Sequence, residues 1–256
     1  MTLQILTVPC LSDNYAYIAH DPQNGATALI DVPEAAPILE TLRQQGWSLD
    51  QVLLTHHHAD HVQGLAEVLA AHPATVIGAS ADAHRLPALD RAVAQGDTVT
   101  IGGETGRVLD VSGHTVGHIA FHFPGAQAVF TADSLMALGC GRLFEGTAAQ
   151  MWESLSKLAA LPPATMVYPG HEYTQANAKF ARSVDPDNPA LISRSEAVDA
   201  ARSKGQPTVP STLAEERATN PFLRASDPEM KARMGLPRAS DAEVFAEIRA
   251  RKDNFG

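Results

Sequence analysis

Hydrophobic and polar positions in the first two thirds of the chain follow two alternating periods. Short runs rich in Val, Ile, Leu and Tyr, bounded by Pro, Gly, Asn or Asp, are typical of β-strands. Between them, apolar residues three and four positions apart predict amphipathic helices with plausible stop signals. We therefore expect strands at 3–8, 15–19, 26–31, 52–55, 74–79, 98–101, 107–111, 119–123, 128–131 and 166–168, and helices at 34–45, 62–71 and 148–160.

The pattern changes near Glu172, where the chain becomes polar and helical with Pro-broken pieces such as VDPDNPA and a final helix at 241–251. This order predicts an α/β (α+β) protein, a four-layer αββα sandwich with a C-terminal helical domain. We expect a first domain at 1–171 and a smaller helical domain at 172–256. No GxGxxG motif follows a predicted strand, which argues against a Rossmann sheet.

Composition excludes several classes of protein. With 256 residues, 45% of them hydrophobic, the chain is long enough for a large core. A formal net charge of -10 argues against a nucleic-acid binder. Only Cys10 and Cys140 occur, too few for a disulfide framework, and no signal peptide or membrane span is evident. We expect a cytoplasmic monomer without nucleic-acid or membrane partners.

One stretch carries an unusual density of metal-ligand side chains: His56, His57, His58, Asp60 and His61 within QVLLTHHHADHVQG. In an extended loop, His56 and His58 point the same way and His57 points the opposite way. Asp60 and His61, at the predicted start of a helix, project at another angle. A single tetrahedral site cannot accept all four and keep a position for water, so the pattern predicts two adjacent metals.

Three further ligand-type residues follow predicted strands: His114, Asp133 and His171. We predict that His56, His58 and His114 hold one divalent ion, that Asp60, His61 and His171 hold the other, and that Asp133 bridges them. Zinc is expected first, although such ligands also accept iron or manganese. Of the remaining histidines, His20, His72, His84 and His122 are assigned to loops or the surface. His57 and His118 are intermediate, and a place behind the ligands stays open for them.

The expected nucleophile is a hydroxide held by the metals, since water between two cations loses its proton near neutral pH. Asp133, Asp60 and His61 would then be the catalytic residues. A nucleophilic Cys140 is disfavoured because no partner base is evident, and the absence of GxSxG disfavours a serine hydrolase.

The His-x-His-x-Asp-His run, followed by the later ligands, resembles the metallo-β-lactamase superfamily. The ordered series SDNYAYI, THHHADH, GHTVGHI, FTADSL, LGCGRLFEG, PGHEYT, TNPFLR and RARKD resembles the glyoxalase II (hydroxyacylglutathione hydrolase) family across essentially the whole chain. The resemblance implies hydrolysis of S-lactoylglutathione to glutathione and lactate, the second step of methylglyoxal detoxification.

The resemblance also implies a glutathione pocket completed by the C-terminal domain, with contacts from Arg142, Phe144, Tyr173, Arg249 and Lys252. The family commonly has Lys and Tyr where this chain has Arg142 and Phe144, so a cation is kept and a hydroxyl is lost. Basic residues at the end of the last predicted helix fit the carboxylates of glutathione, but they also fit the negative end of a helix dipole.

Other functions remain open at this stage. A persulfide dioxygenase of the same superfamily would use a single iron held by two histidines and one carboxylate, which the second ligand set disfavours. A β-lactamase would show signs of secretion, and a nuclease would show a basic surface. A non-catalytic metal-binding or scaffold protein would keep the ligands without the chemistry.

Overall fold

The computed structural model describes residues 3–255, and the chain divides into two compact units. Unit 1 comprises Met1–Asp110 and Val116–Ala132; unit 2 comprises Val111–Thr115 and Asp133–Gly256. The boundary between residues 171 and 172 that the sequence suggests lies inside unit 2. The predicted domain boundary is therefore a different division from that between the compact units, and it stays a prediction.

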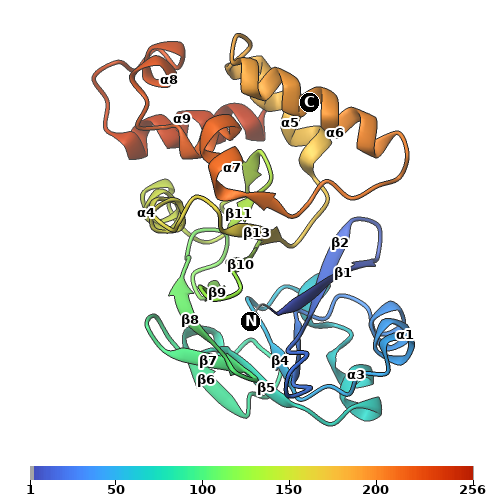
Figure 1. Cartoon of the computed structure of the whole chain (residues 1–256). Helices are drawn as coiled ribbons and strands as arrows, with labels where there is room; N and C mark the ends of the chain where they lie inside the picture. The colour runs from blue at the N-terminus through green and yellow to red at the C-terminus, as the bar shows by residue number, and fades with distance from the viewer. Residues whose placement is uncertain (1–2, 256) are drawn as a thin grey trace. The chain divides into compact units, whose positions relative to one another are not determined.

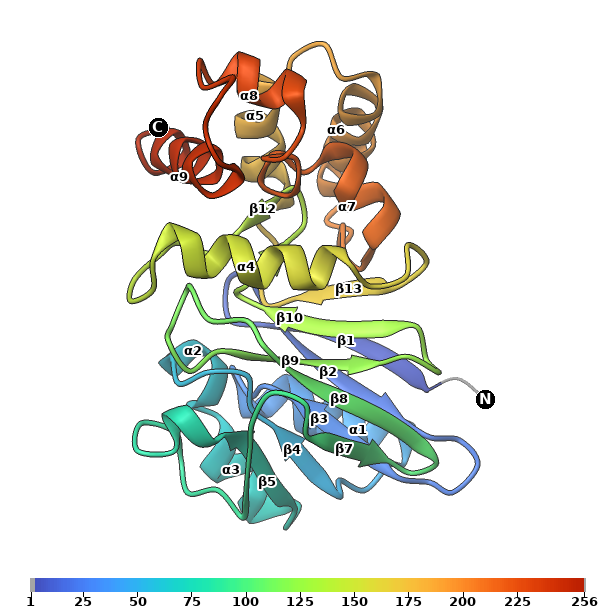
Figure 2. The same ribbon diagram turned by 90° about the vertical axis from the view of Figure 1, so that its left-hand side faces the viewer.

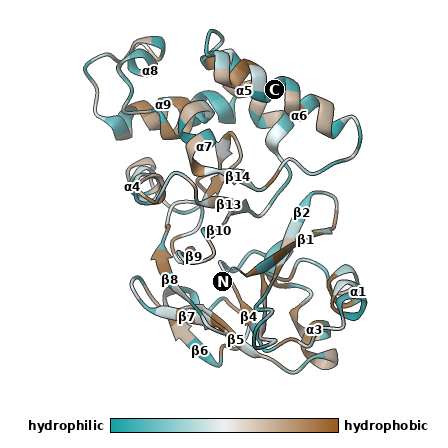
Figure 3. Cartoon of the chain, in the orientation of Figure 1, coloured by the Kyte–Doolittle hydropathy of each residue, from teal (hydrophilic) through white to brown (hydrophobic). Residues whose placement is uncertain are grey.

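The first sheet of unit 1 is mixed. Strands β1, β2 and β3 pair antiparallel, whereas β3 to β6 run parallel. Figure 3 shows hydrophobic residues along β4 and β5, two inner strands of this sheet, as expected for parallel strands that are covered on both faces. In order the strands are β1 (Gln4–Cys10), β2 (Asn14–His20), β3 (Thr27–Ile30), β4 (Gln51–Leu53), β5 (Thr75–Ala79) and β6 (Arg91–Val93).

The second sheet of unit 1 is antiparallel and follows the chain from β7 to β10. The rings of Tyr17 on β2 and Phe130 on β10 lie 5.7 Å apart, so the two sheets share a core. Helices α1 (Ala35–Gln45) and α3 (Leu65–Ala71) lie together beside the first sheet (Figure 1). The strands are β7 (Thr98–Ile101), β8 (Glu104–Asp110), β9 (Ile119–Phe123) and β10 (Ala128–Ala132).

Unit 2 is mainly helical (Figure 2). It contains α4 (Ala148–Ala159), α5 (Thr174–Val184), α6 (Pro189–Arg202), α7 (Leu213–Thr219), η2 (Pro221–Leu223), α8 (Pro228–Arg233) and α9 (Asp241–Asp253). Two short antiparallel pairs join them: β11 (Leu135–Met136) with β12 (Gly139–Cys140), and β13 (Met166–Pro169) with β14 (Ser211–Thr212).

Local sequence explains where the helices of unit 2 begin. Helices α4 and α9 both start with a capping box, Thr147 with Gln150 and Ser240 with Glu243. In each box two backbone N–H groups that lack helical partners are satisfied by side chains. The two helices pack together, with the rings of Trp152 and Phe245 6.2 Å apart.

The α+β class with a helical C-terminal region is confirmed, but several local predictions were wrong. The helix expected at 62–71 is two helices, α2 (Ala59–Val62) and α3, separated at Gly64. A Cβ at Gly64 would lie 2.9 Å from the backbone N of Ala35, so the chain passes too closely for a side chain. The expectation of surface or loop positions was also wrong for His20 and His122, which are buried on β2 and β9.

Within residues 3–255, no helix has the length and apolar character needed to cross a membrane.

Candidate metal centre

In unit 1 the histidine cluster occupies the turn from β4 into α2. Parallel pairing of β3 and β4 brings their C-terminal ends to one edge of the sheet. His56 and His61 are fully buried, and their rings lie 4.2 Å apart. The ring of His58 lies 4.8 Å from that of His56. Because α2 begins at Ala59 rather than near His61, both Asp60 and His61 are helical residues.

Asp31, at the end of β3, fixes two of these histidines. Its Oδ1 accepts the backbone N–H of Thr55 at 2.8 Å, and its Oδ2 accepts the Thr55 hydroxyl at 2.7 Å. Oδ2 also accepts from His61 Nδ1 at 2.9 Å. Since the Thr55 proton is directed to Asp31, the hydroxyl accepts from His56 Nδ1, 3.0 Å away. Both imidazoles therefore carry the proton on Nδ1, which leaves Nε2 as the ligand atom.

The hydrogen bonds of Asp31 explain why this residue lies among ligand-type side chains without being a predicted ligand. Asp31, His56 and His61 offer ligand atoms within 4.8 Å of one another, close enough to hold an ion. The carboxylate of Asp31 is already filled by hydrogen bonds from Thr55 and His61. We therefore interpret Asp31 as a hydrogen-bond partner behind the ligands, a common arrangement around metal-bound histidines.

The remaining residues of the loop are held from other directions. His57 Nδ1 lies 3.0 Å from Oδ2 of the buried Asp82, as expected if His57 points away from His56 and His58. Asp60 receives Asn14 Nδ2 at 3.0 Å, and its Oδ2 lies 3.7 Å from His61 Nε2. His118 stacks on His56 with ring centroids 4.5 Å apart.

Unit 2 brings together the other three predicted ligands. Oδ2 of Asp133 lies 3.4 Å from His114 Nε2 and 3.3 Å from His171 Nε2. The Nδ1 of His114 faces the carbonyl oxygen of Arg142 at 2.8 Å, which makes Nδ1 the protonated nitrogen. A bare Nε2 beside a carboxylate oxygen is unfavourable unless a cation or an added proton lies nearby.

The donor sets in both units therefore fit divalent metal ions. In each unit an imidazole Nε2 faces a carboxylate oxygen while Nδ1 is held by an acceptor. Neutral imidazole and carboxylate are the ligand types expected for zinc, iron or manganese. The predicted ligands within each unit thus lie close together. The assignment of all seven ligands to two ions stays a prediction.

The predicted glutathione contacts differ in exposure. Phe144 is 61% exposed with its ring 5.2 Å from that of His114, and Tyr173 is 40% exposed and stacks on His171 at 4.6 Å. The side chain of Arg142 is exposed. Arg249, by contrast, is only 6% exposed. Arg249 donates to the carbonyl oxygen of Cys140 and to Asp253, so its guanidinium is already engaged.

Two electrostatic effects bear on function in unit 2. Burial raises the pKa of Cys140 to about 11, even though Arg249 lies beside it. A thiol of that kind stays protonated at neutral pH, which agrees with the expectation that Cys140 is no nucleophile. Burial and then the charge of Arg249 lower the pKa of Lys252. Its ammonium lies 5.4 Å from the centre of the Phe180 ring and 5.8 Å from that of Phe255.

Sequence reasoning missed Asp31, Thr55 and Asp82. A signal existed for Asp31, since an acidic residue that ends an apolar strand next to a histidine-bearing strand is placed to meet it. No comparable signal marked Asp82, which is 25 residues from His57 and lies in the short helix η1 (Ser80–Asp82).

Comparison with known proteins decides the family. Residues 13–171 match the model of the metallo-beta-lactamase superfamily, and residues 172–255 match that of the hydroxyacylglutathione hydrolase C-terminus. The chain is 66% identical over 255 residues to hydroxyacylglutathione hydrolase of Roseobacter denitrificans, covering 100% of both chains. The chain belongs to the hydroxyacylglutathione hydrolase family.

Solved structures of this superfamily share the fold. ETHE1 from Myxococcus xanthus is 26% identical with a TM-score of 0.64, and the match covers 100% of both chains. TTHA1623, solved in a di-iron-bound form, is 25% identical with a TM-score of 0.63. That match covers 86% of this chain and 100% of the other. Members of this family are metal-dependent hydrolases, which the histidine and aspartate groups of both units fit.

Proposed function

We propose that the protein hydrolyses S-(2-hydroxyacyl)glutathione thioesters, chiefly S-lactoylglutathione, to glutathione and a 2-hydroxy acid. The supporting observation is the full-length similarity to hydroxyacylglutathione hydrolases, which includes the family's own C-terminal region at residues 172–255. The reaction would be the second step of methylglyoxal detoxification. We further propose that the enzyme is a monomer that works in the cytoplasm, where glutathione is abundant.

The ligands of both units are proposed to hold two divalent ions, zinc before iron or manganese. His56, His58 and His114 would hold one, Asp60, His61 and His171 the other, and Asp133 would bridge them. Bound ions of this kind supply a hydroxide at neutral pH and stabilise an oxyanion. Asp31 and Thr55 contribute by keeping the Nδ1 protons of His61 and His56 away from the ligand atoms.

The residues of the chain need supply no general acid for the leaving group. A thiol has a pKa of about 8.5, so a thiolate departs without first taking a proton. Asp133 forms ion pairs with the predicted ligands His114 and His171.

Recognition of glutathione is proposed to involve Arg142, Phe144 and Tyr173 near the thioester end and the C-terminal cations Arg249 and Lys252 at the carboxylate end. Arg142 and Arg249 share Asp253 as an ionic partner, with distances of 3.5 and 2.8 Å. The local charge therefore stays positive, which favours a dicarboxylate ligand.

The decisive experiment measures free thiol released from S-lactoylglutathione by the full-length protein, with and without a chelator. We expect hydrolysis that disappears with the chelator and returns with zinc, together with close to two metal ions per chain. Metal-replete protein that releases no thiol would support a scaffold. Oxygen consumption with glutathione persulfide, without thioester hydrolysis, would instead favour the persulfide dioxygenase alternative.

A further inference from the structure

The hairpin β11–β12 lies between residues already assigned to the candidate site. Asp133 comes two residues before β11, and Arg142 comes two residues after β12. Its turn places Leu138 in the left-handed region with a φ of 56°. A short hairpin with such a residue is marginal by itself, so contacts from elsewhere must hold it.

Four buried side chains of unit 2 hold the backbone of this hairpin. Asn177 Nδ2 donates to Ala137 O at 3.0 Å, and Arg249 Nη1 donates to Cys140 O at 3.0 Å. Asn220 Nδ2 donates to Met136 O at 3.1 Å and to Gly139 O at 3.0 Å. Glu216 Oε2 accepts the N–H of Leu138 at 2.9 Å. These anchors come from α5, α7, the start of η2 and α9.

The anchors Glu216 and Asn220 belong to one buried network. Asn220 Nδ2 lies 3.1 Å from Glu216 Oε2, and the other carboxylate oxygen accepts from Arg194 and from the hydroxyl of Ser211. Both Glu216 and Asn220 are 0% exposed. A buried carboxylate is tolerated only when it is paired and hydrogen-bonded, so this network strongly specifies one arrangement of the hairpin.

The segment that follows β12 contacts the predicted ligands directly. Gly141 donates its N–H to Ser134 O at 3.1 Å. A Cβ at Gly141 would lie 2.0 Å from the carbonyl oxygen of Asp133 and 2.9 Å from His114 Nδ1. The next residue, Arg142, supplies the carbonyl that sets the His114 tautomer. A shift of the hairpin would therefore move the groups that orient Asp133 and His114.

We propose that Asn220 and Glu216 are positioning residues that act through the hairpin β11–β12 on the ligands Asp133 and His114. This inference rests on the proposed metal centre and deepens it, because it names what holds the unit 2 ligands in place. The His114 partner is a backbone carbonyl, so its position depends on the course of the chain rather than on a side chain. The hairpin anchors determine that course.

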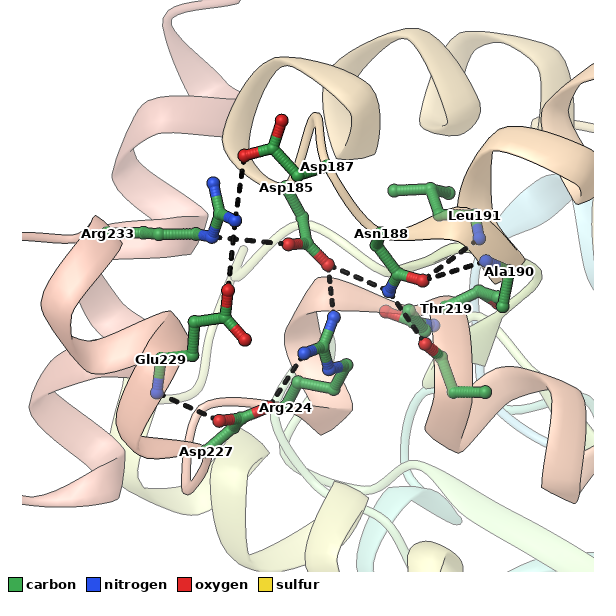
Figure 4. A network of polar contacts seen from close by, with 12 residues as sticks. Asp185, Asp187, Asn188, Ala190, Leu191, Thr219, Arg224, Asp227, Glu229 and Arg233 are labelled. Atoms are coloured by element: carbon green, nitrogen blue, oxygen red, sulfur yellow. Dashed lines mark hydrogen bonds and ion pairs between the residues drawn. The ribbon is translucent and has the colours of Figure 1, made fainter.

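The alternative is that the network serves only the stability of the helices, and unit 2 provides a matched control. Asn188 has the same design as Asn220, whose Oδ1 accepts from Phe222 N. Figure 4 shows Asn188 with its partners. Its Oδ1 caps a helix, accepting from Ala190 N and Leu191 N, and its Nδ2 donates to Ala218 O and to the carboxylate of Asp185. None of its described contacts involves the hairpin.

The test compares Asn220→Asp with Asn188→Asp in full-length, zinc-loaded protein. Each change keeps a capping oxygen and removes the amide donor beside a carboxylate. We expect zinc to leave Asn220→Asp for a chelator at least about tenfold faster than wild type, as for other partners behind metal ligands, and to leave Asn188→Asp at the wild-type rate. In cobalt-substituted protein the visible absorption should change only for Asn220→Asp.

A folded Asn220→Asp protein with the wild-type release rate and cobalt spectrum would overturn the proposal. If that variant does not fold, Asn177→Ala, which removes only the donor to Ala137 O, decides with the same two outcomes. Thioester hydrolysis by wild type is measured in parallel. A wild type that binds zinc without hydrolysing the thioester would reject the proposed function but leave the zinc-release comparison valid.

Discussion

The two units hold their predicted ligand histidines by different means. In unit 1, side chains set the tautomers, with Asp31 accepting from His61 and Thr55 accepting from His56. In unit 2, a backbone carbonyl, that of Arg142, sets the tautomer of His114. A side-chain acceptor can be removed by one substitution. A carbonyl acceptor can be disturbed only by moving the chain, which is why the anchors of a hairpin acquire importance in unit 2.

The strongest test of unit 2 replaces the proposed bridge. Asp133→Asn should reduce thioester hydrolysis more than any change behind the ligands, by at least about a hundredfold, because an amide lacks the charge and the second strong ligand oxygen. The measurement is kcat of folded protein together with metal content. Near-normal hydrolysis by metal-replete Asp133→Asn would show that the bridge is misassigned.

The corresponding test of unit 1 removes a side-chain acceptor. Asp31→Asn should weaken metal binding by about ten- to a hundredfold, because the amide replaces one acceptor oxygen by a donor, which then faces either the Thr55 N–H or the donors of His61 and the Thr55 hydroxyl. Asn tolerates the left-handed backbone at this position, where φ is 56°. Competition with a chelator measures the affinity. The control is Asp21→Asn, directly after β2, where a buried carboxylate accepts from Gly103 N.

A smaller effect is expected where the units' ligands are left intact. Lys252→Ala should lower kcat/KM for the glutathione thioester by about tenfold, mainly through KM, since one charge-assisted contact is worth about 1.5 to 3 kcal/mol. Bound metal should not change. Adding Arg249→Ala should also speed metal release, because Arg249 anchors Cys140 O. Equal kcat/KM for Lys252→Ala and the exposed control Lys204→Ala would refute the contact.

The smallest effect concerns pH and stability away from the ligands. Burial raises the pKa of Asp227, but hydrogen bonds from Arg224 and from Glu229 N outweigh it and lower the pKa below 3.8. A lowered folded-state pKa stabilises the fold above the unfolded-state value, and the contribution is lost as pH falls through the folded value. Asp227→Asn keeps an oxygen that can cap the helix but removes the titrating carboxyl. As pH falls below about 4, the variant should therefore lose less unfolding free energy than wild type does. Identical pH profiles would contradict this.

Much of the fold follows from local pattern. The strands Thr98–Ile101 and Ile119–Phe123 match their predicted ranges because strand-forming residues and flanking turns fix both ends. The split between α2 and α3 was missed because it depends on a close approach between Gly64 and Ala35. Two-residue strands such as β11 and β14 carry no period at all, and they form because buried side chains or a neighbouring strand complete their hydrogen bonds.

The candidate site was predictable in its ligand types but not in its supports. His56, His58, Asp60 and His61 form one sequence cluster, and His114, Asp133 and His171 each follow a strand. The supporting groups are invisible in such a pattern because they act through long-range contacts. Asp82 meets His57 across 25 positions, and Asn220 meets Met136 across 84.

Asp31 illustrates a conflict between backbone strain and hydrogen bonding. Its φ of 56° is disfavoured for a residue with a Cβ, and a left-handed conformation costs roughly 1 kcal/mol that glycine would not incur. Glycine would relieve this strain, but it would leave the buried donors of Thr55 and His61 without their acceptor, at a cost of about 1 to 3 kcal/mol for each unsatisfied group. Engineering a hardier variant of this protein should accordingly hold position 31 constant and search elsewhere.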